Sequence, residues 1–312
     1  MSPIGQHQLR ARETGTTVTG IKQSEFKKAL ITIPSYIEQK TIANILSALD
    51  EKIETNNQIN EKLEEMARAL FKHWFVDFEF PNENGDPYKS SGGEMVESEL
   101  GMIPKGWEYV ELKELLKVKH GYAFKSKNFT ENNTNLLVLT PGNFKIGGGF
   151  KNDKFKYLNV GVSFPEEYIL TSGDLIITMT DLSRDGDTLG FPAFVPNDKE
   201  SLYLHNQRIG KIELKVDFSI MYLYQILCTT EYRWHILSTA TGTTVKHTAP
   251  KRIEKFKILI PPDNILGDYE EKISSFFNKI EKINEENRLL SKIRDTLLPK
   301  LMSGEVRVPI KS

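Results

Sequence analysis

The stretch GTTVTGIKQSEFKKALITIP, at residues 15–34, recurs 227 positions later as GTTVKHTAPKRIEKFKILIP, at residues 242–261. The correspondence continues without a gap to residue 75, and 16 of the 61 aligned pairs are identical. An ungapped match of this length indicates that the chain contains one structural unit twice. Because the match extends well beyond the quoted copies, the segment that follows each copy decides the fold.

Both copies lead into a heptad pattern of mostly apolar residues. The first seam runs from Ile42 to Trp74 in alternating four- and three-residue steps, and adding 227 gives a second seam from Tyr269 to Leu301 in the same register. Each pattern predicts a helix of about 33 residues, roughly 50 Å long, which needs another helix as its partner. We expect the two helices to pack against each other through Leu46, Leu49, Ile53, Asn60, Leu63, Ile273, Phe276, Ile280, Asn287 and Leu290.

Three features of these helices carry separate predictions. Asn60 and Asn287 would fix the alignment of the seam if each lies opposite a hydrogen-bonding group, and the alternative is that both face water. Pro299 should end or kink the second helix within about one turn. The aromatic stretch FKHWFVDFEF at residues 71–80 is either core for the end of the first helix or a docking patch for another subunit.

The remaining chain predicts a linker and a mixed domain. Residues 81–100 are rich in Pro, Gly, Ser and acidic side chains, which indicates an exposed linker. Residues 101–262 combine a tucked Trp107 and a short amphipathic helix with the β-rich runs LLVLT, GDLIITMT, FPAFVP and RIGKIEL. A helical pattern occupies residues 217–238, and a strand closes the domain before Pro261. The predicted fold class is α+β: a mixed α/β domain plus two long helices.

Length and composition exclude several classes of protein. At 312 residues, with 39% hydrophobic and 10% aromatic residues, the chain is long enough for about two folded domains. A single cysteine, Cys228, excludes a disulfide framework, and no apolar run approaches the roughly 18 residues of a membrane span. We therefore expect a cytoplasmic protein without a membrane partner. Residues 101–260 carry 21 basic and 17 acidic side chains, an excess that allows a polyanionic partner.

Motifs for catalysis are missing from the sequence. It has no Gly-rich dinucleotide loop, Walker loop, nucleophile elbow or metalloprotease helix, and its six histidines lack ligand spacing. The segment DLSRDGDTLGFP at residues 181–192 resembles a calcium loop, but Pro192 stands where a bidentate Glu is required. We predict no catalytic residue, no metal site and no cofactor in this chain.

Several stretches of the mixed domain instead suit duplex DNA. KVKHGYAFKSKNF, at residues 117–129, interleaves basic side chains with aromatic rings, and TMTDLSRDG at residues 178–186 and HNQRIG at residues 205–210 offer Arg, Asn and Gln, which can pair with base edges. The small, hydroxyl-rich loop at residues 238–247 can approach a DNA backbone closely. Each stretch alone would be interpreted as a solvated loop, and their coincidence in one basic domain supports DNA binding. The predicted DNA-binding residues are Lys119, His120, Tyr122, Phe124, Lys125, Lys127, Thr178, Thr180, Arg184, Asn206, Gln207, Arg208, Thr243, Thr244, Lys246 and His247.

This layout resembles the specificity subunit of type I restriction-modification enzymes. The similarity is carried by IPKGWEYVELKEL at the entry of the mixed domain, by INEKLEEMARALFKHWFVDFEF on the first helix, and above all by LLPKLMSGEVRV at residues 297–308. It implies two target-recognition domains that alternate with two spacer helices. The helices pair antiparallel and hold the domains apart, so that each domain reads one half of a bipartite site in double-stranded DNA.

The resemblance also implies a non-catalytic subunit with protein partners. Methylation, with S-adenosylmethionine, would belong to methyltransferase (modification) subunits docked on the coiled coil. Cleavage, with ATP and Mg, would belong to restriction subunits. No cofactor is expected in this chain itself.

One departure from the family pattern concerns the first recognition domain. The expected parts are a C-terminal remnant of that domain at residues 1–35, a spacer helix at 36–80, the linker at 81–100, a target-recognition domain at 101–262, a second spacer helix at 263–304 and a tail at 305–312. Most of the first domain is missing, as in a truncated or split subunit or a fragment of a longer protein. Such a chain could complete itself as a two-fold homodimer, which would read a palindromic site.

Two other classes of protein compete with this interpretation. A self-contained DNA methyltransferase or nuclease needs an Asn/Asp-Pro-Pro-aromatic or metal-carboxylate motif, and GDPY and IPPD fall short of the first. A stand-alone coiled-coil scaffold without DNA affinity would lack the salt-dependent DNA binding expected of a specificity subunit.

Overall fold

The computed structural model describes residues 3–14, 20–30 and 33–309, and the chain forms two compact units. We call them the helical unit, Met1–Leu63 with Lys282–Ser312, and the α/β unit, Glu64–Glu281. The division runs through both long helices, whereas the predicted domain boundaries lie at their ends. Part of the predicted remnant at residues 1–35 lies outside the described residues, and the described part contains two short helices, α1 (Pro3–Arg10) and α2 (Gln23–Phe26).

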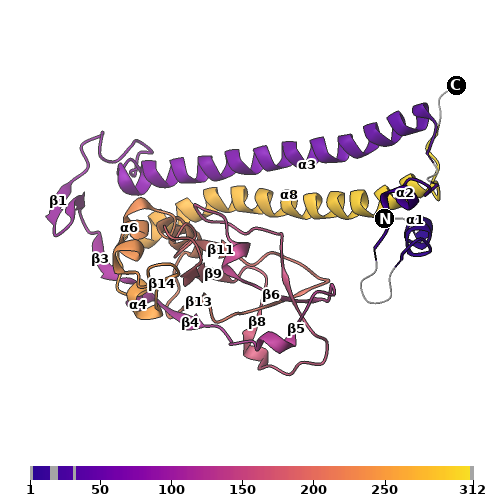
Figure 1. Ribbon diagram of the computed structural model, residues 1–312. Coiled ribbons are helices and arrows are strands. Elements are labelled where there is room, and N and C mark those ends of the chain that lie inside the picture. The colour runs from indigo at the N-terminus through magenta and orange to yellow at the C-terminus, as the bar shows by residue number, and fades with distance from the viewer. Residues whose placement is uncertain (1–2, 15–19, 31–32, 310–312) are drawn as a thin grey trace. The chain divides into compact units, whose positions relative to one another are not determined.

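Two long helices dominate the secondary structure: α3 (Tyr36–Phe71), purple in Figure 1, and α8 (Asp263–Ser303), yellow. The start of α3 is fixed by a reciprocal cap, in which the Ser35 amide donates to the Glu38 carboxylate (2.9 Å) and the Glu38 amide donates to the Ser35 hydroxyl (3.3 Å). Pro299 lies inside α8, and the helix ends at Ser303, about one turn later as predicted.

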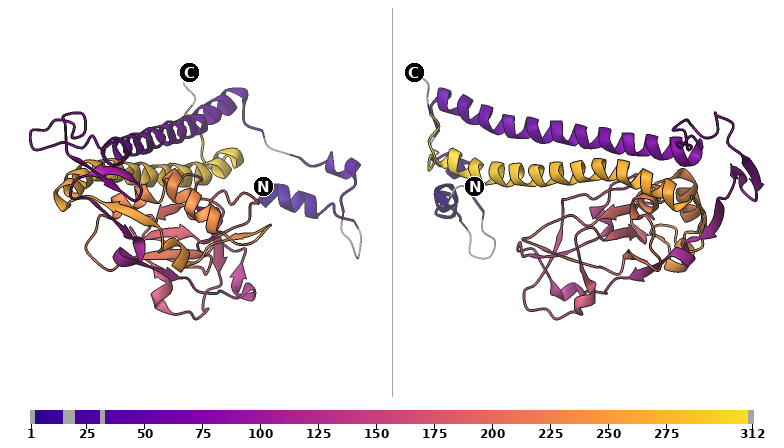
Figure 2. Two further views of the ribbon diagram at one scale, coloured as in Figure 1. Left: turned by 90° about the vertical axis from the view of Figure 1, so that its left-hand side faces the viewer. Right: turned by 180° about the vertical axis from the view of Figure 1, so that it is seen from behind.

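In the helical unit, α3 and α8 lie side by side and run in opposite directions (Figure 2). Near the start of α3, Ile42 is buried in one cluster with Leu301 of α8, and Leu46 packs on the same cluster. Further along α3, Asp50 accepts a 2.8 Å bond from the Arg294 guanidinium. Contacts that advance along α3 therefore move back along α8, which confirms the predicted antiparallel pairing.

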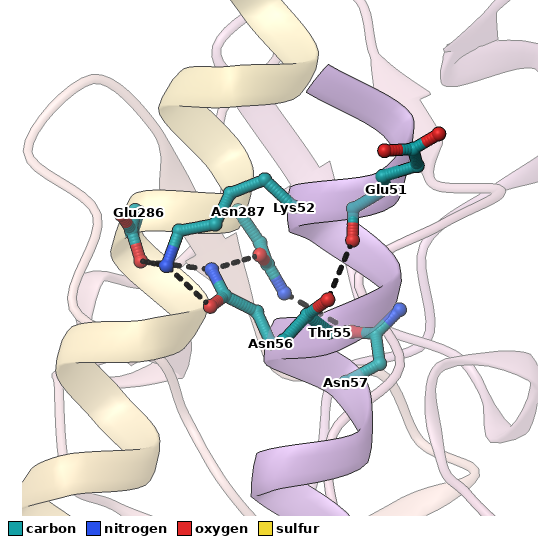
Figure 3. Close-up of polar contacts among 7 residues, drawn as sticks. All are labelled: Glu51, Lys52, Thr55, Asn56, Asn57, Glu286 and Asn287. Atoms are coloured by element: carbon teal, nitrogen blue, oxygen red, sulfur yellow. Dashed lines mark hydrogen bonds and ion pairs between the residues drawn. The ribbon is translucent and has the colours of Figure 1, made fainter. Parts of the chain in front are cut away.

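A layer of amides crosses this helix pair (Figure 3). The Asn60 amide group donates to the Asn284 side-chain oxygen at 2.8 Å, and Asn287 donates to the Asn57 side chain at 3.0 Å. The offset of 227 converts one of these bonds into the other, so the repeat in sequence is also a repeat in pairing. Asn56 is buried and donates to Asn287 at 2.8 Å. The prediction of a bonded, register-fixing layer is confirmed, and the water-facing alternative is wrong for the buried Asn60.

Aromatic rings form the centre of the α/β unit. After α3 the backbone continues as a short π-helix, η1 (Lys72–Val76), and the Phe75 ring lies 4.8 Å from the rings of both Tyr222 and Tyr269. Trp107 is buried in the same cluster, as predicted. The aromatic stretch at residues 71–80 is thus core, and the docking-patch alternative is wrong.

The α/β unit contains two larger sheets. The antiparallel four-stranded sheet, in the order β11-β9-β13-β4, consists of β4 (Leu116–His120), β9 (Leu175–Thr178), β11 (Pro192–Phe194) and β13 (Ile209–Leu214). The five-stranded sheet, in the order β5-β7-β6-β12-β8, consists of β5 (Phe129–Thr130), β6 (Leu136–Val138), β7 (Lys156–Leu158), β8 (Ile169–Leu170) and β12 (Leu202–Leu204). Among the pairs of named strands in the described residues, only β12 and β6 are parallel.

Shorter elements complete the α/β unit. Three strand pairs are β1 (Met95–Ser98) with β2 (Gly101–Pro104), β3 (Glu108–Glu111) with β15 (Lys257–Ile260), and β10 (Thr180–Asp181) with β14 (Lys246–His247). The remaining helices are α4 (Leu112–Leu115), α5 (Ile220–Ile226), α6 (Thr230–Thr239) and α7 (Pro250–Ile253), with single turns η2 (Ser126–Asn128), η3 (Pro141–Asn143) and η4 (Glu166–Tyr168).

Most predicted strands are present, and one predicted helix is largely wrong. Strand β9 is buried on both faces, since Ile177 belongs to one core cluster and Ile176 to another, which explains its continuous apolar run. The amphipathic helix expected after Trp107 is reduced to the four residues of α4, because β3 on one side pairs with the distant strand β15. Residues 81–100, expected as a plain linker, also contain β1.

Candidate nucleic-acid interface

Loops from three strands meet at one edge of the four-stranded sheet. His120 at the end of β4 pairs with Gly210 of β13, and Ile209 at the start of β13 pairs with Thr178 at the end of β9. Because neighbouring strands are antiparallel, the loop after β4, the loop before β13 and the loop after β9 leave the sheet at the same edge. A fourth loop joins them through β10 and β14, where Thr180 pairs with His247. We call this edge with its four loops the loop edge.

Main-chain hydrogen bonds fix the shape of the loop edge. The Tyr122 amide donates to the His205 carbonyl at 2.7 Å, and the Gln207 amide donates back to the Tyr122 carbonyl at 3.0 Å. The Met179 amide donates to the Arg208 carbonyl at 2.8 Å. These bonds do not depend on the side chains that project from the loops.

The structure brings most of the predicted DNA-binding residues to this edge. An open depression of ≈ 750 Å³ gathers four of them, and its lining consists of Leu182, Arg184, Asp185, Thr243, Thr244 and Lys246. Beside it, Tyr122 lies against Phe124 and forms a bridge with Asn206. The predicted residues with exposed side chains are His120, Lys125, Lys127, Arg184, Gln207, Arg208, Thr243, Thr244 and His247, and the half-buried ones are Lys119, Tyr122, Phe124, Asn206 and Lys246. Lys125 and Lys127 lie at η2, away from the depression.

Two of the predicted contacts need correction, and a third residue has a partner within the protein. Thr178 has no exposed surface, and its hydroxyl donates to the Thr188 carbonyl, so it belongs to the core. Thr180 is also buried, and its hydroxyl lies 3.0 Å from Nδ1 of His247, which it orients. Lys119 is only partly exposed, and its ammonium is bound 2.7 Å from the Glu167 carboxylate. The sequence alone does not show which hydroxyl or ammonium groups have a hydrogen-bonding partner within the fold.

The loop from Asp181 to Gly190 is held rigidly from inside. The Asp181 carboxylate accepts bonds from the backbone amides of Ser183 (2.6 Å) and Thr188 (2.5 Å), and one from the Thr188 hydroxyl (2.5 Å). Burial would raise the pKa of Asp181, but these hydrogen bonds outweigh it and hold the pKa below its usual value. The Arg233 guanidinium, on α6, donates to the Gly186 and Leu189 carbonyls. The resemblance to a calcium loop thus reflects a carboxylate that binds its own loop.

Three residues at or beside the loop edge are not among the predicted ones. Leu182 and Asp185 line the depression, and Glu167 binds Lys119. Asp185 lies in the segment that resembles a calcium loop, where it would be a metal ligand. Its position beside Arg184 in the depression was therefore not predicted. Glu167 lies 48 residues from Lys119 in the chain, and no local pattern could have connected them.

Replacing Gly121 with alanine should force the loops after β4 and before β13 apart. An added Cβ would lie 2.2 Å from the Asn206 carbonyl oxygen and 2.7 Å from the His205 ring, so the backbone must move. We expect the free energy of unfolding to fall by about 1–3 kcal/mol. Thermal unfolding measures this, and Gly267→Ala is the matched control, since nothing lies within 4 Å of its Cβ and the helix should gain stability. If Gly121→Ala and Gly267→Ala had the same stability, the close approach of Gly121 to Asn206 would be contradicted.

The chain matches one family of proteins over most of its length. The family model for the type I restriction modification DNA specificity domain matches residues 6–65 and 104–294. In the described part of the chain, no helix has both the length and the apolar character needed to cross a membrane.

Relatives match over nearly the whole chain. The type I restriction enzyme MjaIX specificity subunit of Methanocaldococcus jannaschii is 28% identical over 94% of this chain, and the chain spans 64% of that relative's length. The HindI specificity subunit of Haemophilus influenzae is 26% identical over 88% of this chain and 69% of its own length. The crystal structure of the type I S subunit from M. genitalium aligns with a TM-score of 0.51 at 18% identity, covering 96% of this chain and 70% of that one, and so has a similar fold.

Proposed function

Because the chain belongs to the family of type I restriction-modification DNA specificity domains, we propose that it is a DNA-recognition subunit of such an enzyme. The α/β unit reads one half of a bipartite site in double-stranded DNA. The paired helices set the spacing and dock the modification subunits. Methyl transfer with S-adenosylmethionine and ATP- and Mg-dependent cleavage are carried out by partner subunits in the cytoplasm, and this chain is non-catalytic.

The observation that supports DNA reading most directly is the convergence of four loops at one sheet edge. Arg184 and Lys246 line one depression with the hydroxyls of Thr243 and Thr244. A guanidinium can donate two bonds to guanine, and Lys and Thr side chains suit phosphates. Asp185 adds an acceptor, which can pair with the amino group of cytosine. Donors and an acceptor on a fixed backbone are what discrimination between base pairs requires.

Methylation-motif sequencing tests the proposal in its biological setting. The full chain is co-expressed with its modification and restriction subunits, and the modified motif is compared with that of a strain in which the Arg184, Arg208 and Lys246 codons are changed to alanine. We expect the motif to disappear or to lose defined positions, with the complex still purified intact. An unchanged motif in the triple variant would contradict the assignment of the loop edge as the DNA-reading surface.

Arg208→Ala and Lys127→Ala should change DNA binding in different ways. Arg208 is exposed in the loop before β13, so its loss should relax one base position by about 1–3 kcal/mol in competition binding. Lys127 is exposed at η2, and its loss should weaken binding to all duplexes equally and lower the slope of log affinity against log salt by about 1. If the two variants gave the same change in discrimination and slope, the two roles would be wrong.

A further inference from the structure

Two lysines face each other on neighbouring strands below the loop edge. Lys119 of β4 and Lys211 of β13 are register partners, so their side chains leave the same face of the sheet. Each is bound by one carboxylate at 2.7 Å, Lys119 by Glu167 and Lys211 by Asp174. Like charges directly opposite each other destabilise a sheet, and both ion pairs relieve that repulsion.

The two ion pairs differ in exposure. Asp174 is held inside the fold, with its side chain 15% exposed and a second bond from the Thr171 amide at 2.8 Å. The side chain of Glu167 is 58% exposed and reaches Lys119 from the outside. The hydrogen bond with Glu167 raises the pKa of Lys119 and so favours the charged ammonium while the pair is formed. The Lys211 pair is therefore structural, whereas the Lys119 pair can be exchanged for another anion.

Glu167 is also placed beside the surface that faces DNA. It belongs to η4, and the next residue, Tyr168, lies under the Lys119 ammonium at 5.2 Å and against the Tyr122 ring at 5.3 Å. The Tyr168 carbonyl accepts the His205 amide at 2.8 Å, which ties η4 to the loop before β13. A phosphate that binds the Lys119 ammonium therefore competes with the Glu167 carboxylate for it.

We propose that Glu167 opposes non-specific DNA binding: its carboxylate occupies Lys119 in the free protein and competes with DNA phosphates for that ammonium. This inference rests on the proposed function. Non-specific binding depends on phosphate contacts, so a lysine withheld from phosphates weakens it directly. Binding at the correct site adds base contacts, which offset the loss of the ion pair. The competing carboxylate thereby lowers the affinity for DNA that offers phosphate contacts alone.

The test uses the full chain and a fluorescent duplex of random sequence, titrated over a range of salt concentrations. Glu167→Gln removes the charge and keeps the shape, and should tighten binding about two- to fivefold. The slope of log affinity against log salt should steepen by about 0.9, the value for one more neutralised phosphate. Glu166→Gln is the matched control, because Glu166 is the exposed neighbour and makes no ion pair with the described residues.

A second background identifies the lysine that is involved. In a Lys119→Met chain, Glu167→Gln should have no further effect on DNA affinity, since the ammonium for which the two anions compete is gone. An equal effect in that background, an equal effect of Glu166→Gln, or an unchanged slope would overturn the inference. If the unaltered chain showed no salt-dependent DNA binding, the proposed function and this inference would both be wrong. If it bound DNA but Glu167→Gln had the same slope of log affinity against log salt, only the inference would be wrong.

Discussion

Phe75→Ala is expected to lower the free energy of unfolding by about 3–5 kcal/mol, the range for deleting a buried aromatic side chain. Phe75 is 6% exposed, and its ring lies 4.8 Å from Tyr222 and from Tyr269, 5.3 Å from Phe71 and 6.1 Å from Trp107. These partners come from four separate segments of the α/β unit. A cavity at this point would loosen all of them at once.

Urea unfolding of the full chain, followed by tryptophan fluorescence, measures the effect of Phe75→Ala. Val76→Ala is the matched control, because Val76 is the next residue and is 51% exposed. It should change stability by less than about 1 kcal/mol. Similar losses in the two variants would mean that the aromatic cluster is not the centre of this core.

Acidification should destabilise the chain through His205. This residue has no exposed surface, and its Nε2–H donates to the Ile209 carbonyl at 2.9 Å. Burial lowers the pKa of His205 from 6.5 to about 4, and the nearby ammonium groups of Lys119 and Lys211 act in the same direction. Between these two values the unfolded chain binds a proton that the folded chain does not, so stability rises with pH.

The contribution of His205 is complete above pH 6.5 and is lost as the pH falls toward about 4. Its full size is up to about 3 kcal/mol. His205→Gln keeps a donor for the Ile209 carbonyl and removes the titration. The difference between parent and variant in unfolding free energy should therefore shrink as the pH falls through this window. A difference that does not change with pH would show that His205 is not held neutral in the fold.

The long helices could be predicted from the sequence because their signal is periodic and repeated. Spacing alone places Ile42 on the first seam and Leu301 on the second, and the structure buries them in one cluster. The buried amide of Asn60 is part of the same spacing. The prediction for the segment after Trp107 failed because its strands are decided by distant partners: β3 pairs with β15, and β4 pairs with β13. No local propensity contains that information.

The segments of the candidate site could be proposed from the sequence, but which of their side chains are buried or paired could not. Residue types identified the segments that meet at the loop edge. Which groups face inward depends on tertiary contacts, as the buried hydroxyl of Thr178 and the bound ammonium of Lys119 show. Glu167 meets Lys119 only because the fold brings these distant segments together.

The loop edge is shaped by its own main chain, so its side chains can change without loss of that shape. Five exposed side chains on it, those of Arg184, Gln207, Arg208, Thr243 and Thr244, make no hydrogen bond or ion pair with the described residues. Their replacement should therefore change the free energy of unfolding little, and other side chains can occupy these positions. A combinatorial library at these five codons should therefore yield mostly folded proteins.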